Sequence, residues 1–187
     1  MAAFTALFDA NVLYPSELRN FLMHLALSGL FRARWMAGIH EEWIAALLEK
    51  RPDLSREKLE RTRTLMDKHT IDALVTGYED LIPSLQLPDP NDRHVLAAAL
   101  RGRADVIVTA NLRDFPSSIL APLGIEAQHP DEFILHLLDL SPGLVTKAAQ
   151  DHRQSLKRPA MDVDVYLTTL ERQGLTLTVS VLREYMF

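Results

Sequence analysis

Cysteine is absent from the 187 residues of this sequence. Its absence excludes disulfide bonds, thiolate metal ligands and a cysteine nucleophile, and it suits a reducing compartment, so we expect a cytoplasmic protein. Apolar residues make up 48% of the chain and charged residues 24%. Because this balance is ordinary for globular proteins, we expect one domain with a full hydrophobic core and a small appendage at most.

Long hydrophobic runs are absent as well. No apolar stretch approaches the roughly 20 residues that a membrane-spanning helix needs. The first residues, MAAFTALFDANVL, lack a basic start, and their apolar run meets Asp9 too early for a signal peptide. We therefore expect no membrane partner.

Several common functional motifs are also missing. The glycine-rich dinucleotide fingerprint, the phosphate-binding P-loop and the nucleophile elbow of serine hydrolases do not occur. An excess of basic residues is lacking too, since the net charge is -5. Nucleic-acid-binding proteins are usually basic. The net negative charge therefore argues mildly against a nucleic-acid-binding protein. The argument is weaker if the acidic residues are concentrated in a metal site.

Strands and helices alternate along the first two thirds of the chain. Short apolar runs predict buried strands over residues 4–8, 105–109 and 125–128. Apolar residues at helical spacing, with capping residues at the ends, predict helices over residues 16–28, 40–50, 55–75 and 91–101. This alternation is typical of an α/β domain with a mainly parallel sheet.

The pattern changes after Pro130. Four helical segments are predicted over residues 131–140, 144–156, 162–173 and 176–186. We therefore divide the chain into an α/β domain over residues 1–130 and a C-terminal helical extension over residues 131–187. The extension is too small to be counted on as an independent unit.

Three aspartates stand where a parallel sheet places ligands, beyond the carboxyl ends of its strands. Asp9 ends the first strand, and Asp114 follows the second strand by five residues. Asp92 shares a helical stripe with Val95, Leu96 and Ala99, so its carboxylate is expected on the side that faces the core. Each position alone also suits a helix-capping or loop acid without a functional role.

Together, these acids predict a metal site. Carboxylates that converge repel one another unless a cation lies between them. Carboxylate and amide oxygens, the latter from Asn111, suit hard ions such as Mg²⁺ or Mn²⁺. One or two such ions can generate a hydroxide and stabilise the charged transition state of phosphodiester cleavage.

Two segments resemble the PIN domain family: FTALFDANVLYP at the start, and LPDPNDRHVLAAALRGRADVIVTANLRDFP later in the chain. The resemblance covers about residues 4–130 and implies a three-layer α/β/α fold and a Mg²⁺- or Mn²⁺-dependent ribonuclease acting on RNA. Many bacterial members are VapC-like toxins that pair with a small antitoxin protein, and members often form homodimers. The C-terminal helices resemble the extension of a VapC-like subgroup.

The resemblance also implies site residues. Asp9 corresponds to the first acid, Asp92 to the third, Asp114 to the fourth and Asn111 to the polar position before the last acid. The second acid is ambiguous between two neighbours, Glu41 and Glu42. Spacing to the following Trp43 and Leu47 favours Glu42, whereas Glu41 shares a helical stripe with apolar residues. We choose Glu42.

Three further features leave alternatives open. We interpret Asp89 as a loop residue, with a supporting role near the site as the alternative, and His94 as a surface or hydrogen-bonded histidine rather than a general base. The basic residues over 51–69 alternate with acids, which predicts a solvated helix face, with an RNA or partner contact as the alternative.

Two other functions compete with the nuclease. The first is a catalytically silent interaction module on the same fold, which the presence of all four expected acids disfavours. The second is a phosphatase with Asp9 as nucleophile. That class would normally want an Asp-x-Asp motif, and here the third position is Asn11.

Overall fold

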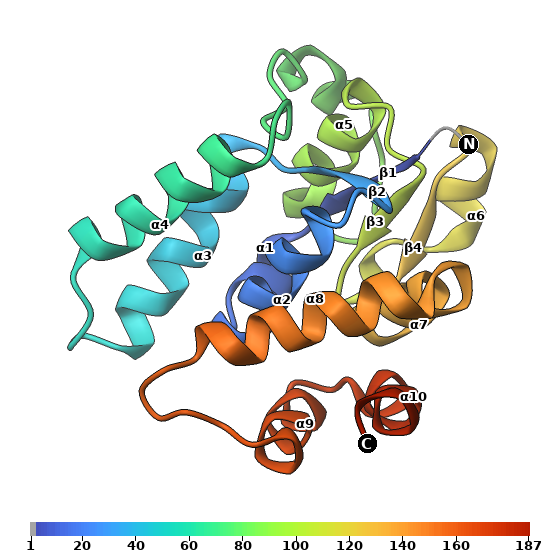
Figure 1. Cartoon of the computed structure of the whole chain (residues 1–187). Coiled ribbons are helices and arrows are strands. Elements are labelled where there is room, and N and C mark those ends of the chain that lie inside the picture. The colour runs from blue at the N-terminus through green and yellow to red at the C-terminus, as the bar shows by residue number, and fades with distance from the viewer. Residues whose placement is uncertain (1–2) are drawn as a thin grey trace.

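A parallel sheet lies at the centre of the computed structural model, which describes residues 3–187 (Figure 1). Its strands are β1 (Phe4–Phe8), β2 (Phe31–Arg34), β3 (Val106–Val108) and β4 (Glu126–Gln128), in the order β2-β1-β3-β4. Neighbouring strands all pair in parallel, with Ala6 of β1 opposite Ala33 and Val106. The carboxyl ends of the strands therefore meet at one edge of the sheet.

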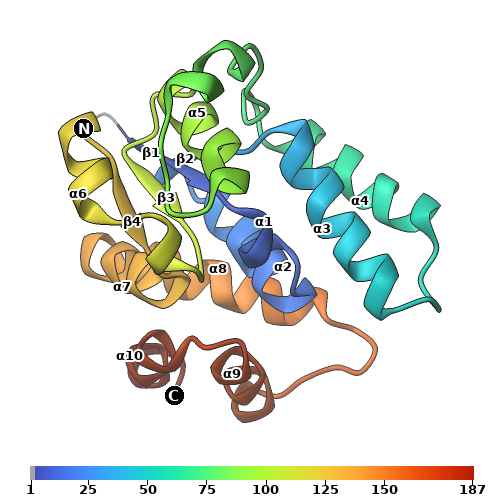
Figure 2. The same cartoon turned by 180° about the vertical axis from the view of Figure 1, so that it is seen from behind.

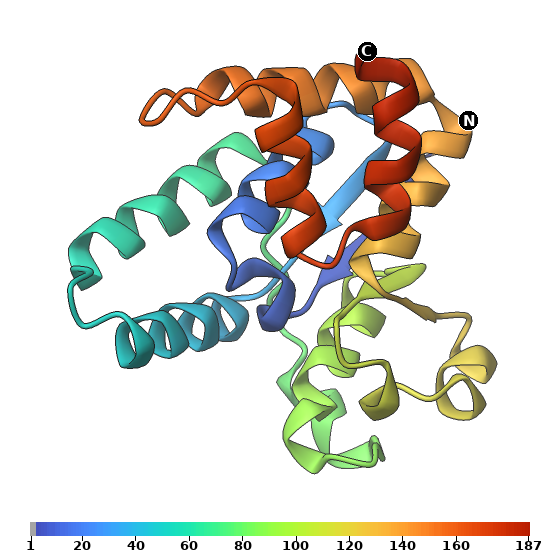
Figure 3. The same cartoon turned by 90° about the horizontal axis from the view of Figure 1, so that it is seen from below.

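Helices cover both faces of this sheet. The α-helices are α1 (Ala10–Leu13), α2 (Ser16–Ala26), α3 (Ala37–Lys50), α4 (Arg56–His69), α5 (Arg93–Arg101), α6 (Ser117–Leu120), α7 (Pro130–Leu140), α8 (Pro142–Ser155), α9 (Val163–Arg172) and α10 (Thr176–Met186). The 3₁₀ turns are η1 (Glu79–Ser84), η2 (Pro90–Asp92), η3 (Leu112–Asp114) and η4 (Ala121–Leu123). Because α5 lies on one side of the sheet and α7 and α8 on the other (Figures 1 and 3), the predicted three-layer α/β/α fold is confirmed.

No helix within residues 3–187 is both long enough and apolar enough to cross a lipid bilayer.

Strand β2 and the end of α4 differ most from the sequence-based prediction, which also lacks the short helices α1 and α6 and the 3₁₀ turns. Strand β2 was missed because its sequence, FRAR, is an edge strand in which buried Phe31 and Ala33 alternate with arginines, so no apolar run marks it. The helix expected over residues 55–75 ends at His69. Beyond it the chain turns and pairs with Trp35, whose backbone N–H donates to the carbonyl of Ala73.

An aromatic cluster joins the sheet to α7. Phe4 and Phe8 of β1 and Phe31 of β2 all contact Phe133 of α7, with ring centroids between 5.0 and 6.1 Å apart. These edge-to-face contacts are the arrangement that aromatic pairs prefer. The hydrophobic core therefore continues across residue 130. The division at that position stays a prediction, and it concerns which residues serve the site rather than where the core ends.

Helices α3 and α4 form an arm that projects from the sheet (Figures 1 and 2). A buried polar network ties the arm to the sheet. Trp43 Nε1 donates to His40 Nδ1 at 3.0 Å, so the hydrogen on His40 Nε2 points to Asp67 Oδ1, 3.0 Å away. The same Asp67 oxygen accepts from Trp35 Nε1 at 2.7 Å. This network sets the rotation of α3 about its own axis, and with it the direction of each side chain on that helix.

The C-terminal extension is attached through a buried histidine. Helix α8 packs on α2, and α9 and α10 lie outside α7 and α8 (Figure 3). His152 of α8 is fully buried, with its Nδ1 2.9 Å from the hydroxyl oxygen of Tyr166 and its ring stacked on Phe21. Burial, helped by nearby His24, lowers the pKa of His152 to about 4.

We predict that this histidine makes folding sensitive to acid. The unfolded chain titrates near 6.5, whereas folded His152 stays neutral down to about pH 4. Between these values the unfolded state binds more protons at this histidine, so the contribution of His152 to the free energy of unfolding should fall as the pH drops, by roughly 2–3 kcal/mol in all. Thermal and denaturant melts across this range measure the slope.

Two variants separate His152 from the general effect of acid. His152→Gln should lose this contribution, so the acid-induced loss of stability between about pH 6.5 and pH 4 should be smaller than in the wild type. His136→Gln, which removes an exposed histidine of α7, should keep the full slope. An unchanged slope in His152→Gln would show that other groups cause the acid sensitivity.

Candidate metal centre at the end of the sheet

Asp9 is held rigidly at the carboxyl end of the central strand. It follows Phe8 directly, caps α1 and is 6% exposed. Its carboxylate accepts hydrogen bonds from the backbone N–H of Ala10 at 2.8 Å, from Thr109 Oγ1 at 2.9 Å and from Asn11 Nδ2 at 3.1 Å. Burial raises the pKa of Asp9, although the hydrogen bonds from Thr109 and from the backbone of Ala10 oppose the shift.

Asn11 and Thr109 connect the two loops that carry the acids. Asn11 Nδ2 also lies 3.2 Å from Thr109 Oγ1, and Asn11 Oδ1 accepts from the backbone N–H of Ala110 at 3.0 Å. The backbone N–H of Asn111 donates to Thr109 Oγ1 at 3.1 Å. The loops after β1 and β3 are therefore fixed relative to each other. Sequence analysis did not foresee this role of Asn11, although its place two residues after Asp9 was the available signal.

Asp92 lies at the junction of η2 and α5, half-buried beside the other acids. Its side chain makes no capping hydrogen bond to the helix, so the simple helix-cap interpretation does not apply. The pKa of Asp92 is raised to about 6, first by desolvation and then by the charges of Asp9, Asp114 and Asp89. Asp92 is thus the point at which the negative charges meet.

Asp89 and Asp114 complete a cluster with Asp92. One carboxylate oxygen from each of the three lies within 4.8 Å of the others. Asn111 Nδ2 donates a short hydrogen bond to Asp114 Oδ2. Asp89 was interpreted as a loop residue, and the structure brings it into the cluster because Pro90 opens a tight turn in which the Asp92 N–H donates to the Asp89 carbonyl at 3.1 Å.

The two neighbouring glutamates of α3 point to different surroundings. Glu42 lines the cavity beside Asp9, and its Oε1 lies 2.5 Å from Nε2 of His94 on α5. This hydrogen bond raises the pKa of His94. Glu41 instead binds Arg56 and Arg63 of α4, at 2.7 and 2.6 Å, and these hydrogen bonds lower the pKa of its carboxyl.

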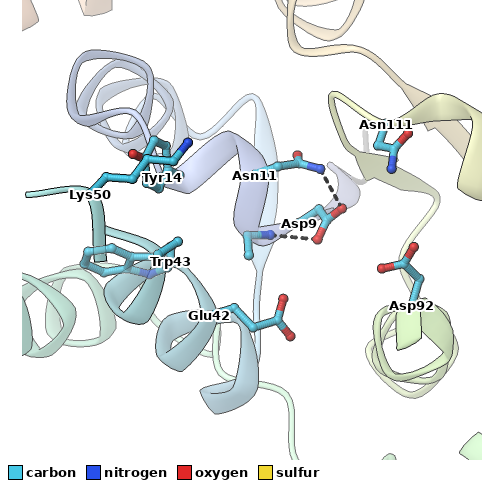
Figure 4. Close-up of a pocket in the computed structure, with 10 residues that line it drawn as sticks. Asp9, Asn11, Tyr14, Glu42, Trp43, Lys50, Asp92 and Asn111 are labelled. Carbon is cyan, nitrogen blue, oxygen red and sulfur yellow. Dashed lines mark hydrogen bonds between the residues drawn. The ribbon is translucent and has the colours of Figure 1, made fainter. Parts of the chain in front are cut away.

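An open cavity of about 380 Å³ lies in front of these acids (Figure 4). Asp9, Glu42, Asp92 and Asn111 lie at one end, and Tyr14, Trp43 and Lys50 lie at the other. Asp114, also predicted for the site, does not line the cavity but joins the group through Asp92. The structure therefore gathers all five residues that the sequence analysis selected.

The donor set fits a hard divalent cation. Asp9, Asp92, Asp114 and Glu42 offer carboxylate oxygens, and Asn111 offers a neutral amide oxygen. Burial raises the pKa of both Asp9 and Asp92, and the charge of Glu42 on Asp9 and the charges of Asp9, Asp114 and Asp89 on Asp92 add to these shifts. A cation would offset the repulsion between these charges, and oxygen ligands of this kind suit Mg²⁺ or Mn²⁺.

Comparison with known proteins agrees with this geometry. Residues 5–113 match the PIN domain family, and residues 130–184 match a family described as the VapC50 C-terminal domain. A protein of Mycobacterium tuberculosis (strain ATCC 25618 / H37Rv), "Putative ribonuclease VapC50", is 54% identical over 68 residues, which are 36% of this chain and 40% of that protein. No solved structure matches. The chain belongs to the PIN domain family, with a C-terminal extension of the VapC50 type.

Proposed function

We propose that this protein is a Mg²⁺- or Mn²⁺-dependent endoribonuclease with Asp9, Glu42, Asp92 and Asp114 as its acidic residues. The observation that supports it most is the meeting of carboxylates around Asp92, where one oxygen each from Asp89, Asp92 and Asp114 lies within 4.8 Å of the others. Burial, together with the charges of these neighbours and of Asp9, raises the pKa of Asp92 to about 6. Such crowding is costly for a purely structural site and is relieved by a cation. The name of the mycobacterial relative, a ribonuclease, supports RNA as the substrate class.

The chain's own residues would divide the work. Asp9, Asp92 and Asp114 would hold one or two ions, with Asn111 as a neutral ligand. Bound ions of this kind lower the pKa of water and neutralise charge on a phosphoryl group. Glu42 stands at the cavity across from these ligands and would orient the attacking water, while its hydrogen bond to His94 keeps the carboxylate in place.

The C-terminal extension would act by shaping access to the site. Every residue that lines the cavity lies before residue 112, so residues 131–187 would contribute contacts to RNA or to a protein partner and no metal ligand. This is the functional meaning we give to the division at residue 130.

We further propose that the protein is the toxin of a toxin–antitoxin pair and acts in the cytoplasm, with homodimerisation as a family expectation. The match of residues 130–184 to the VapC50 C-terminal domain supports this assignment. A small DNA-binding protein encoded next to this gene should suppress the growth arrest caused by expressing this chain. Growth that is unaffected by expression of the active protein would contradict the toxin assignment.

The first activity prediction concerns Glu41 and Glu42. The wild-type protein should cleave RNA with Mg²⁺ or Mn²⁺ and not with EDTA. Glu42→Gln should lower the cleavage rate by roughly 100-fold or more, as expected when a group that acts on the attacking water is lost. Glu41→Gln removes exposed ion pairs of little energetic weight, so the rate should change by less than about threefold.

These two variants are matched controls for each other, since each replaces one glutamate by glutamine on the same helix. If Glu41→Gln is the inactive variant, the assignment of the second acid is wrong. If both variants cleave like the wild type, neither glutamate takes part in the reaction.

The second prediction concerns stability without metal. The folded-state pKa of Asp92 is above its usual value of 3.8, so the folded state binds more protons at this site. The contribution of Asp92 to stability should therefore fall as the pH rises from about 4 to 6, opposite in sign to the contribution of His152. At neutral pH, Asp92→Asn removes this charge and should stabilise the metal-free protein by roughly 1 kcal/mol, allowing for solvent screening. Thermal melts in EDTA measure the difference.

The same melts with Mn²⁺ test the role of Asp92 as a ligand. Metal at 100 times its dissociation constant should stabilise the wild type by about 2.7 kcal/mol, and in Asp92→Asn this gain should shrink. Glu126→Gln, which removes an exposed charge on β4, should behave as the wild type in both conditions. An Asp92→Asn variant that keeps the full metal response would count against the proposed site.

A further inference from the structure

The end of the cavity away from the acids carries an aromatic ring and a cation side by side. The Nζ of Lys50 lies 5.4 Å from the centroid of the Tyr14 ring. Both side chains line the cavity across from Asp9, Glu42 and Asp92 (Figure 4). Lys50 is the one cation among the lining residues, and within residues 3–187 it takes part in no ion pair.

Helix α3 carries the acidic Glu42 and the positively charged Lys50 on the same face. Glu42, Ala46 and Lys50 are four residues apart, so they share one face of the helix, and all three line the cavity. Eight residues of helix span about 12 Å. Lys50 therefore stands some way from the acids and is suited to a phosphate next to the one at the metal site. The small side chain of Ala46 leaves the space between them open.

The segment that carries Tyr14 is fixed to α3 through Arg19. The buried Trp43 ring packs under the guanidinium of Arg19, with 4.5 Å from Cζ to the ring centroid. Arg19 in turn donates to the carbonyl oxygens of Leu13 at 2.7 Å and Tyr14 at 3.3 Å. The short helix that begins beside Asp9 ends at Tyr14. The acid and the ring therefore sit at a fixed separation on one short segment.

We propose that Tyr14 and Lys50 form the subsite for the nucleotide next to the cleaved phosphodiester, an inference that rests on the proposed ribonuclease function. The Lys50 ammonium moves from the ring to the neighbouring backbone phosphate, and a base takes its place on the ring. Base stacking on an aromatic side chain is the sequence-tolerant way in which proteins bind single-stranded RNA. The cation also offsets the repulsion between the acidic end and the RNA backbone.

The test uses the full-length protein and a single-stranded RNA oligonucleotide. Cleavage kinetics with Mn²⁺ give KM and kcat, and fluorescence anisotropy across a salt series gives the affinity in an Asp92→Asn background. Lys50→Gln should raise KM by roughly tenfold, leave kcat within about twofold, and reduce the salt slope of binding by about 0.7, the value for one phosphate contact on a single strand.

Tyrosine variants test the stacking contact separately. Tyr14→Leu should raise KM by roughly tenfold with an unchanged salt slope, and Tyr14→Phe should behave as the wild type because stacking needs the ring and not the hydroxyl. Arg32→Gln, at an exposed position of β2, is the control for the loss of one positive charge and should change neither quantity. Thermal melts verify that each variant is folded.

The outcomes separate this inference from the ribonuclease proposal. A wild type that cleaves RNA with KM and affinity independent of Lys50 and Tyr14 overturns the subsite alone. A Tyr14→Phe variant as weak as Tyr14→Leu also overturns the stacking contact. A wild type that cleaves no RNA, yet binds it through Lys50 and Tyr14, contradicts the nuclease and supports the subsite.

Discussion

Repulsion between like charges around Asp92 is the constraint on which the rest of this structure depends. Bringing several carboxylates together costs a folded chain free energy unless a bound cation offsets their repulsion. In this protein, a rigid backbone holds the acids close together against that repulsion. Buried parallel strands end at the same edge, and Thr109 and Asn11 link the two loops that follow them. The acids stay close because the backbone beneath them cannot spread.

The second determinant is the rotation of α3. Glu41 and Glu42 are neighbours, so a turn of about 100° about the helix axis would exchange their surroundings. His40, which binds Trp43 on the same helix and Asp67 of α4, fixes that rotation from inside the arm. The arginines of α4 then engage Glu41 on the outside. A buried polar network between α3 and α4 thereby decides which glutamate faces the cavity.

Much of this fold could be predicted from sequence, because buried strands and helical stripes leave direct traces. The runs around residues 4–8 and 105–109, and the stripe behind Asp92, marked both the sheet and three of its acids. Strand β2 was not predicted because an edge strand of four residues carries no apolar run. The place of Asp89 in the cluster was kept only as an alternative, because it depends on the turn geometry at Pro90. The choice between the two glutamates depended on contacts with α4 that are remote in sequence.

The aromatic cluster that crosses residue 130 has a consequence for biosynthesis. Phe8, the residue before Asp9, packs against Phe133, and so does Phe31 of the neighbouring strand. A nascent chain that has emerged no further than β4 still exposes this face of the sheet to water, and the strand that carries Asp9 lacks its cover. Burial of the strand that carries Asp9 is therefore complete only once Phe133 of α7 has been synthesised.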